Sequence, residues 1–188
     1  MPSALTHPAV PLALGLALGS RLVPPRLLLV GVLAAVAPDL DVLTFKLGIP
    51  YAHPLGHRGA SHSLSAAFLL GLLAFVAAPV LCCKRLAALV FVFVSYASHG
   101  LLDMLTNGGH GVGLWWPFDT ERVWFPWHPI EVSPIGVKRF LSAAGAKVLL
   151  SELLWVWLPA ATVGLVALGV RRLFSNIPNL PHSHQQVD

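Results

Sequence analysis

The sequence has little charge and almost no cysteine, and both shortages limit what the protein can be. Only 11% of its 188 residues are Asp, Glu, Lys or Arg, whereas 56% are apolar; a soluble domain carries about 25% charged residues. The mean hydropathy is +0.74. The two cysteines, Cys82 and Cys83, are adjacent, so they form no CxxC motif and we expect them to be small apolar residues. This composition indicates an integral membrane protein.

The basic residues are as scattered as they are few. Lys and Arg number 12, for a net charge of +4, and they lack the stripe that marks a nucleic-acid surface. We therefore predict membrane lipid as a partner and no nucleic acid; the sequence does not indicate an oligomeric state. No basic residue precedes the first apolar stretch, so we expect that stretch to be retained and not cleaved as a signal peptide.

Apolar helix is what the sequence has in quantity. We predict an all-α, polytopic helical membrane protein with about five apolar helices, because a full span needs about 20 apolar residues. Three segments are long enough to span and two are shorter: 64–83, 86–105 and 146–170, then 8–20 and 26–37. Pro24 and Pro25 break the chain between the two short helices, and Pro38 should end the second. Ser61 or Ser63 should cap the helix that follows.

Two further segments have a distinct composition. Residues 115–128 hold four of the six tryptophans, and we predict a Trp-rich extramembrane loop because Trp favours the headgroup zone. Residues 1–174 should form a single membrane-embedded domain. Residues 175–188, which include His182 and His184, are polar and are predicted to be a disordered tail.

The paired basic residues predict the orientation. Three connections carry them: Arg21 with Arg26, Lys84 with Arg85, and Arg171 with Arg172. The positive-inside rule puts these connections in the cytoplasm. The N-terminus and the segments 38–63 and 106–145 then share the opposite, non-cytoplasmic face of the membrane. Lys138, Arg139 and Lys147 argue mildly against this orientation.

Histidines and carboxylates gather on that non-cytoplasmic side. Those placed there are His7, Asp39, Asp41, His53, His57, His62, His99, Asp103, His110, Asp119, Glu121, His128 and Glu131. Only Glu152, Asp188 and the two tail histidines fall elsewhere. Imidazole nitrogens and carboxylate oxygens are ordinary zinc ligands, so this segregation points to a metal site on one face.

His99 and Asp103 form the most informative pair. Their i, i+4 spacing puts both side chains on one face of a helix. An ionisable residue in a spanning segment costs several kcal/mol unless it is paired, hydrated or bound to a ligand, and a metal ion supplies that compensation. The alternative is a His–Asp hydrogen bond that faces a watery cleft.

Two short motifs add candidates at the same membrane depth. In PDLD (38–41) either carboxylate could cap a helix; we expect Asp41 to be a ligand and Asp39 to bridge or to act as a general base. In HRGASH (57–62) a turn at Gly59 would let His57 and His62 converge as ligands. Arg58 between them suits an anionic substrate such as a phosphate.

The remaining candidates are weaker. His7 opens the first apolar helix as a ligand or merely as a capping residue. His128 and Glu131, in HPIE, could complete a second metal position or could be solvated loop residues. His53 and His110 carry less indication of ligation.

Several of these motifs resemble one known family. THPAVPLALG (6–15), APDLD (37–41), HRGASHS (57–63), SHGLLDMLTNGG (98–109) and WPF (116–118) are similar to the YdjM-type proteins. These are LexA-regulated, membrane-bound, metal-dependent hydrolases of the inner membrane. The resemblance implies a membrane-embedded metal hydrolase and leaves its substrate open.

A more distant similarity is to zinc-dependent phospholipase C and the zinc nucleases. The order of ligands agrees, from His7 through Asp41, His57 or His62, and His99 with Asp103, to His110 or His128 and Glu131. The final pair is spaced HxxE in place of HxxxE, and no N-terminal Trp is present, so a third metal position stays open.

The functional hypothesis is a hydrolase that uses two or three divalent ions, most simply zinc, on a phosphoester carried by an anionic lipid. Asp39 or Asp103 would act as general base, and Arg58 would steady the anionic group. Two alternatives remain: a transporter or channel lined by the same His and Asp residues, and a non-catalytic protein with a structural metal.

Overall fold

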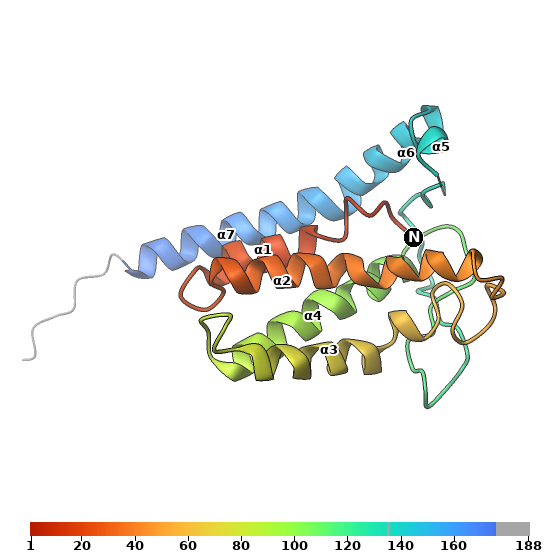
Figure 1. Cartoon of the computed structure of the whole chain (residues 1–188). Helices are drawn as coiled ribbons and strands as arrows, with labels where there is room; N and C mark the ends of the chain where they lie inside the picture. Colours follow the sequence, from red (N-terminus) through yellow and green to blue (C-terminus); the bar gives the residue numbers. More distant parts are fainter. Residues whose placement is uncertain (135, 176–188) are drawn as a thin grey trace, which may run out of the picture.

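The computed structural model describes residues 1–134 and 136–175, which fold as a bundle of helices (Figure 1). The helices are α1 (Ala9–Leu18), α2 (Pro25–Val36), α3 (Leu64–Ala77), α4 (Arg85–Met104), α5 (Val137–Phe140), α6 (Ala143–Glu152) and α7 (Leu158–Ser175). The described residues form only two isolated β-bridges and no strand, so the all-α prediction is confirmed. The predicted tail lies, from residue 176 on, outside the described residues.

The expected set of three long apolar helices and two short ones is also confirmed. The long ones are Pro25–Phe45 (21 residues), Arg85–Met104 (20 residues) and Ala143–Phe174 (32 residues), and the short ones are Ala9–Leu18 and Leu64–Ala77. Two assignments are exchanged relative to the prediction, because 64–83 is one of the short helices and 26–37 belongs to a long one.

The predicted span over 64–83 is cut short by Pro79. α3 ends at Ala77 after 14 residues, because Pro79 has no N–H to donate to the carbonyl of Phe75 and its ring crowds the preceding turn. The chain then turns, with Cys82 in the left-handed region at φ +56°. At the other end Ser63 accepts a hydrogen bond from the backbone N–H of Ala66, so Ser63 is the residue that caps α3.

The α-helix α2 ends just before Pro38, as predicted, but the helical path of the chain continues beyond it. The α-helical hydrogen bonds end at Val36, and the chain continues as the 3₁₀-helix η1 (Ala37–Phe45). Proline has no N–H to donate, but the first residues of a helical segment need no donor. Asp39 and Asp41 therefore lie on a helical extension of α2.

Small residues let three helices approach closely. α4 packs against both α2 and α3, and a methyl group at Gly31 of α2 would lie 2.3 Å from the ring of Phe91. Apolar helices in lipid associate through such close packing of small residues. α1 packs mainly along α7 and also contacts α2 and α4.

α7 and α6 form one long helical rod with an exposed apolar surface. The π-helical turn η3 (Leu153–Trp157) joins them, and only 11% of an apolar 18-residue window of the Ala143–Phe174 segment is buried. An apolar helix with so much uncovered surface needs lipid around it. Figure 1 also shows that the loops after α2 and α4 gather at the end of the bundle near the N-terminus.

Candidate metal centre

Five buried side chains from four separate segments converge at that end of the bundle. They are His7 before α1, Asp39 in η1, His62 in the 3₁₀-turn η2 (Ala60–His62), and His99 and Asp103 in α4. Two overlapping sets have ligand atoms within 4.8 Å of one another: His7, His99 and Asp103, and Asp39, His62 and His99. We call these five residues the metal cluster. His99 belongs to both sets.

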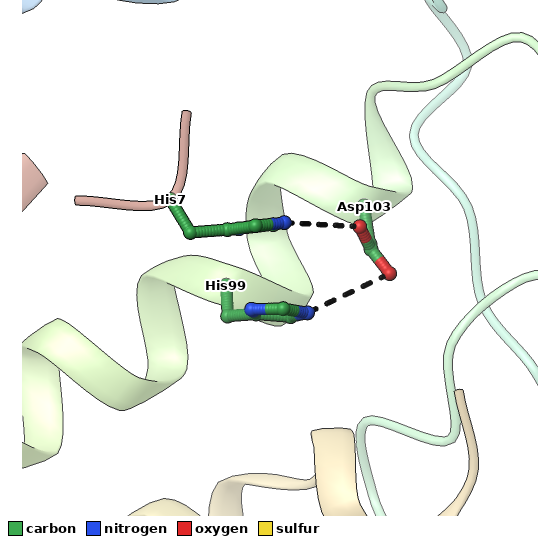
Figure 2. A group of neighbouring side chains, drawn as sticks. All are labelled: His7, His99 and Asp103. Atoms are coloured by element: carbon green, nitrogen blue, oxygen red, sulfur yellow. Dashed lines mark ion pairs between the residues drawn. The ribbon is translucent and has the colours of Figure 1, made fainter. Parts of the chain in front are cut away.

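His7 and His99 present their rings in parallel. The ring centroids lie 3.6 Å apart with an interplanar angle of 12°, and Figure 2 shows both rings directed at the carboxylate of Asp103. His7 Nε2 is 3.9 Å from Asp103 Oδ1, and His99 Nε2 is 4.0 Å from Oδ2. His99 and Asp103 therefore lie on the same face of α4, as their i, i+4 spacing predicts.

The opposite half of the cluster is built by Asp39 and His62. His99 Nε2 lies 3.3 Å from Asp39 Oδ1 and 3.1 Å from His62 Nε2. His62 Nε2 is 3.4 Å from Asp103 Oδ2. The Nε2 atoms of three histidines and the oxygens of two carboxylates therefore face a common centre.

Hydrogen bonds on the far side of two rings fix which nitrogen faces that centre. His99 Nδ1 is 2.7 Å from the carbonyl oxygen of Ala35, and His62 Nδ1 is 3.2 Å from Asp41 Oδ2. A donor bond from Nδ1 leaves the Nε2 lone pair directed inward, as in metal-bound histidines whose other nitrogen pairs with a carbonyl or carboxylate.

Asp41 and His57 lie outside the cluster. The Asp41 carboxylate pairs with His57 Nδ1, accepts from the hydroxyl of Ser61 and accepts from the backbone N–H of Arg58 at 3.0 Å. Both of its oxygens are thereby engaged. Sequence reasoning placed Asp41 and His57 among the ligands; the geometry instead makes Asp41 the residue that orients His62.

Arg58 is buried, with 1% exposure, and its guanidinium contacts the protein itself. Its Nε lies 3.0 Å from Asp103 Oδ2, and its two amino groups donate to the Gly108 carbonyl and the Thr106 hydroxyl. The left-handed backbone at Arg58 (φ +61°) turns the side chain inward. These contacts favour a role in positioning Asp103 over direct contact with a substrate phosphate.

The electrostatics of the cluster favour a cation. Burial lowers the pKa of His7, which keeps its imidazole neutral. Burial acts in the same sense on His62, but Asp103 and Asp41 outweigh it and raise the pKa of His62 to about 9, so without a metal His62 holds a proton that a bound cation would displace. Both oxygens of Asp39, Oδ1 of Asp103 and both nitrogens of His7 have no hydrogen-bond partner among the described residues, whereas Asp103 Oδ2 has Arg58 Nε at 3.0 Å. Buried polar atoms left in this state are expensive, and a divalent metal would satisfy them.

Glu152 holds the N-terminal segment that carries His7. This carboxylate is 1% exposed and accepts hydrogen bonds from the backbone N–H of Ser3, the Ser3 hydroxyl and the Thr6 hydroxyl. The indole N–H of Trp157 also donates to the Thr6 hydroxyl. Sequence reasoning left Glu152 out because it lies apart from the other carboxylates. A carboxylate inside an apolar helix is by itself an indication of such a role.

His128 and Glu131 lie outside both metal sets. His128 is exposed and packs edge-on against Trp124. Glu131 accepts from the side-chain amide of Asn107. The intervening Ile130 is fully buried, and alternation along an extended segment turns its neighbour Glu131 outward. His53 and His110 are exposed as well.

Comparison with known proteins agrees with this architecture. Residues 1–175 match the family described as YdjM inner membrane protein. The chain belongs to that family. It is 45% identical over 171 residues to the inner membrane protein YbcI of Escherichia coli strain K12. The aligned region covers 90% of this chain and 96% of YbcI. No solved structure matches. The family and the apolar helices together make this an integral inner-membrane protein.

In this YdjM-family chain, the role assigned to Asp41 predicts a graded defect. Asp41→Asn removes the charge that orients His62 while keeping the shape of the side chain. We expect zinc affinity to fall by about 10–100-fold, the usual effect of losing a carboxylate behind a ligating histidine. Competition with a chromogenic chelator measures it. Asp119→Asn, an exposed carboxylate of the Trp-rich loop, is the control; complete loss of metal in Asp41→Asn would instead make Asp41 a ligand.

The role of Glu152 predicts a defect at a distance. Glu152→Ala leaves the donors of Ser3 and Thr6 without their acceptor and releases His7, so zinc affinity should fall as far as in His7→Ala. Combining both substitutions should add little, because neighbours acting through one group are not additive. Chelator competition on the single and double variants measures this coupling. Additive losses would show that Glu152 acts independently of His7, and Glu131→Ala controls for charge.

Proposed function

We propose that this protein is a membrane-embedded, metal-dependent hydrolase that acts on a phosphoester. The observation that carries the proposal is the metal cluster, with its buried carboxylate and imidazole atoms that have no hydrogen-bond partner among the described residues. Structural ion pairs would leave few such atoms. The donor set of imidazole nitrogens and carboxylate oxygens fits zinc and similar divalent ions.

Each residue of the cluster has a distinct part in this proposal. His7, His62, His99 and Asp103 would hold the metal, and Arg58 would keep the Asp103 carboxylate in place. Asp39 is the most exposed member of the cluster, at 8%, and both of its oxygens lack a hydrogen-bond partner among the described residues. It is therefore the best placed to take a proton from an attacking water. A divalent metal, when bound, supplies positive charge that makes a water more acidic and offsets charge on phosphoryl oxygens.

The geometry supports a hydrolase better than a permeation path. A channel needs polar groups that continue toward the other end of the bundle. Ser95 and Ser98 are the residues of α4 that extend in that direction, but their hydroxyls donate to carbonyls of the same helix, those of Phe91 and Ser95. Hydroxyls bonded in this way do not form a continuous polar path. A purely structural metal predicts binding without turnover, and this difference can be tested.

The test measures metal content and turnover in the same preparations. Full-length protein purified in detergent should contain a divalent metal by elemental analysis. It should also hydrolyse a phosphodiester or phospholipid from a substrate panel, lose that activity on chelation and regain it with zinc. His62→Ala should lose both properties, whereas His53→Ala should keep both. Activity in metal-free His62→Ala would contradict the hydrolase mechanism, and metal without any turnover would favour the structural alternative.

A further inference from the structure

A basic pocket lies at the end of the bundle opposite the metal cluster. It has a volume of about 290 Å³ and is lined by Leu18, Gly19, Ser20, Arg21, Arg171 and Arg172. Figure 1 shows the two segments that form it, the connection from α1 to α2 and the last turns of α7, on the side away from the N-terminus. The metal proposal does not use this pocket.

Gly19 brings one arginine into the pocket. Its backbone is in the left-handed region, at φ +77°, and a Cβ atom there would lie 1.6 Å from an amino nitrogen of Arg171. Any side chain at this position would displace the guanidinium. Arg171 is therefore packed over the backbone of the connection and does not extend freely away from α7.

Arg21 and Arg171 form no ion pair with a carboxylate among the described residues. The ion pairs of residues 1–134 and 136–175 join histidines or Arg58 to Asp39, Asp41 or Asp103, all at the opposite end. Guanidinium groups that converge without an anion repel one another. Arginine binds phosphate through paired N–H donors, so a phosphate group is the natural counterpart of Arg21 and Arg171.

An apolar groove lies next to this pocket, and one residue lines both. Its volume is about 200 Å³, and all its lining residues are apolar, among them Leu14, Leu22, Val90 and Val94. Leu18 lines both the groove and the basic pocket. A ligand that fills the two spaces together must have an anionic head and an apolar tail.

We propose that this composite site binds an anionic phospholipid. The headgroup phosphate occupies the basic pocket, between Arg21 and Arg171, and one acyl chain lies in the groove against α4. The basic residues of this end follow the positive-inside pattern, and basic pockets between membrane helices on that side suit anionic headgroups. The site is separate from the metal cluster, so it does not depend on the hydrolase proposal.

Native mass spectrometry of the full-length, delipidated protein tests the proposal. We expect phosphatidylglycerol to bind more tightly than phosphatidylcholine of the same acyl chains. Each arginine near a headgroup contributes about fivefold, so Arg21→Gln combined with Arg171→Gln should weaken phosphatidylglycerol binding by about 30-fold. Val90→Trp, which fills the groove and leaves the arginines in place, should weaken binding of the same lipid.

The matched control is Lys84→Gln combined with Arg85→Gln, which removes the same charge from the same end but lines neither space. Equal losses in the two double variants would overturn the site and leave only a general surface attraction. Competition with inorganic phosphate tests whether the acyl chain contributes to binding. If phosphate displaces the bound lipid as effectively as free phosphatidylglycerol does, and Val90→Trp still binds the lipid normally, the site takes a free anion and the proposal is wrong. Circular dichroism checks folding; if the double variant unfolds, Arg21→Gln alone should still show the fivefold loss.

Discussion

His99→Ala should empty the metal centre. His99 is the residue common to both metal sets, and its Nε2 lies within 3.3 Å of both His62 Nε2 and an oxygen of Asp39. Its ring also stacks on His7. Removing His99 therefore takes one ligand from each set and also removes the ring on which His7 stacks. We expect metal content to fall to background and hydrolysis to fall by more than about 100-fold, beyond the effect of losing an orienting carboxylate.

Elemental analysis and an initial-rate assay on the same preparation measure these two losses. His110→Ala is the matched control, because His110 is exposed and its ring packs against Tyr51, outside the metal cluster. It should keep both metal and activity. A His99→Ala protein with its full metal complement would show that the metal is bound elsewhere, and the proposed ligand set would then be wrong.

The sequence predicts the α4 half of this centre better than the η1 half. His99 and Asp103 are four residues apart on a helix that the apolar pattern indicates clearly, so their shared face follows from helical geometry. Asp39 and Asp41 depend on the local type of helix. With three residues per turn in a 3₁₀-helix, residues two apart point about 120° from each other. Asp39 therefore faces His99, while Asp41 faces the HRGASH turn, the reverse of the predicted order of importance.

Two other parts of the site depend on contacts between distant segments. Arg58 reaches Asp103 because its backbone adopts a left-handed conformation, which no spacing rule indicates for an arginine. His7 reaches the cluster because Glu152 holds Ser3 and Thr6 from almost 150 positions away. Periodicity describes neighbours along one element, so it indicates neither contact. The exchange of long and short helices has a simpler origin, the local effects of Pro38 and Pro79.

The second large effect is on stability, and it follows from the buried pair of Arg58 and Asp103. These side chains are 1% and 0% exposed, with Arg58 Nε 3.0 Å from Asp103 Oδ2. Asp103→Ala leaves the guanidinium buried without its carboxylate. Breaking such a pair from one side typically costs about 3–5 kcal/mol, so we expect the free energy of unfolding to fall by about that amount. Thermal unfolding of detergent-solubilised protein, with equal lipid content in each sample, measures the change.

Replacing both partners separates stability from metal binding. Arg58→Met combined with Asp103→Leu substitutes apolar side chains of similar size, and such a replacement is often neutral or stabilising. We expect the double variant to recover most of the stability lost in Asp103→Ala and still to bind no metal, because a ligand of the cluster is missing. Recovery of stability together with metal would show that Asp103 serves only the ion pair. Failure to recover stability would show that Asp103 is held mainly by His7, His62 and His99, the imidazoles that share the cluster with it.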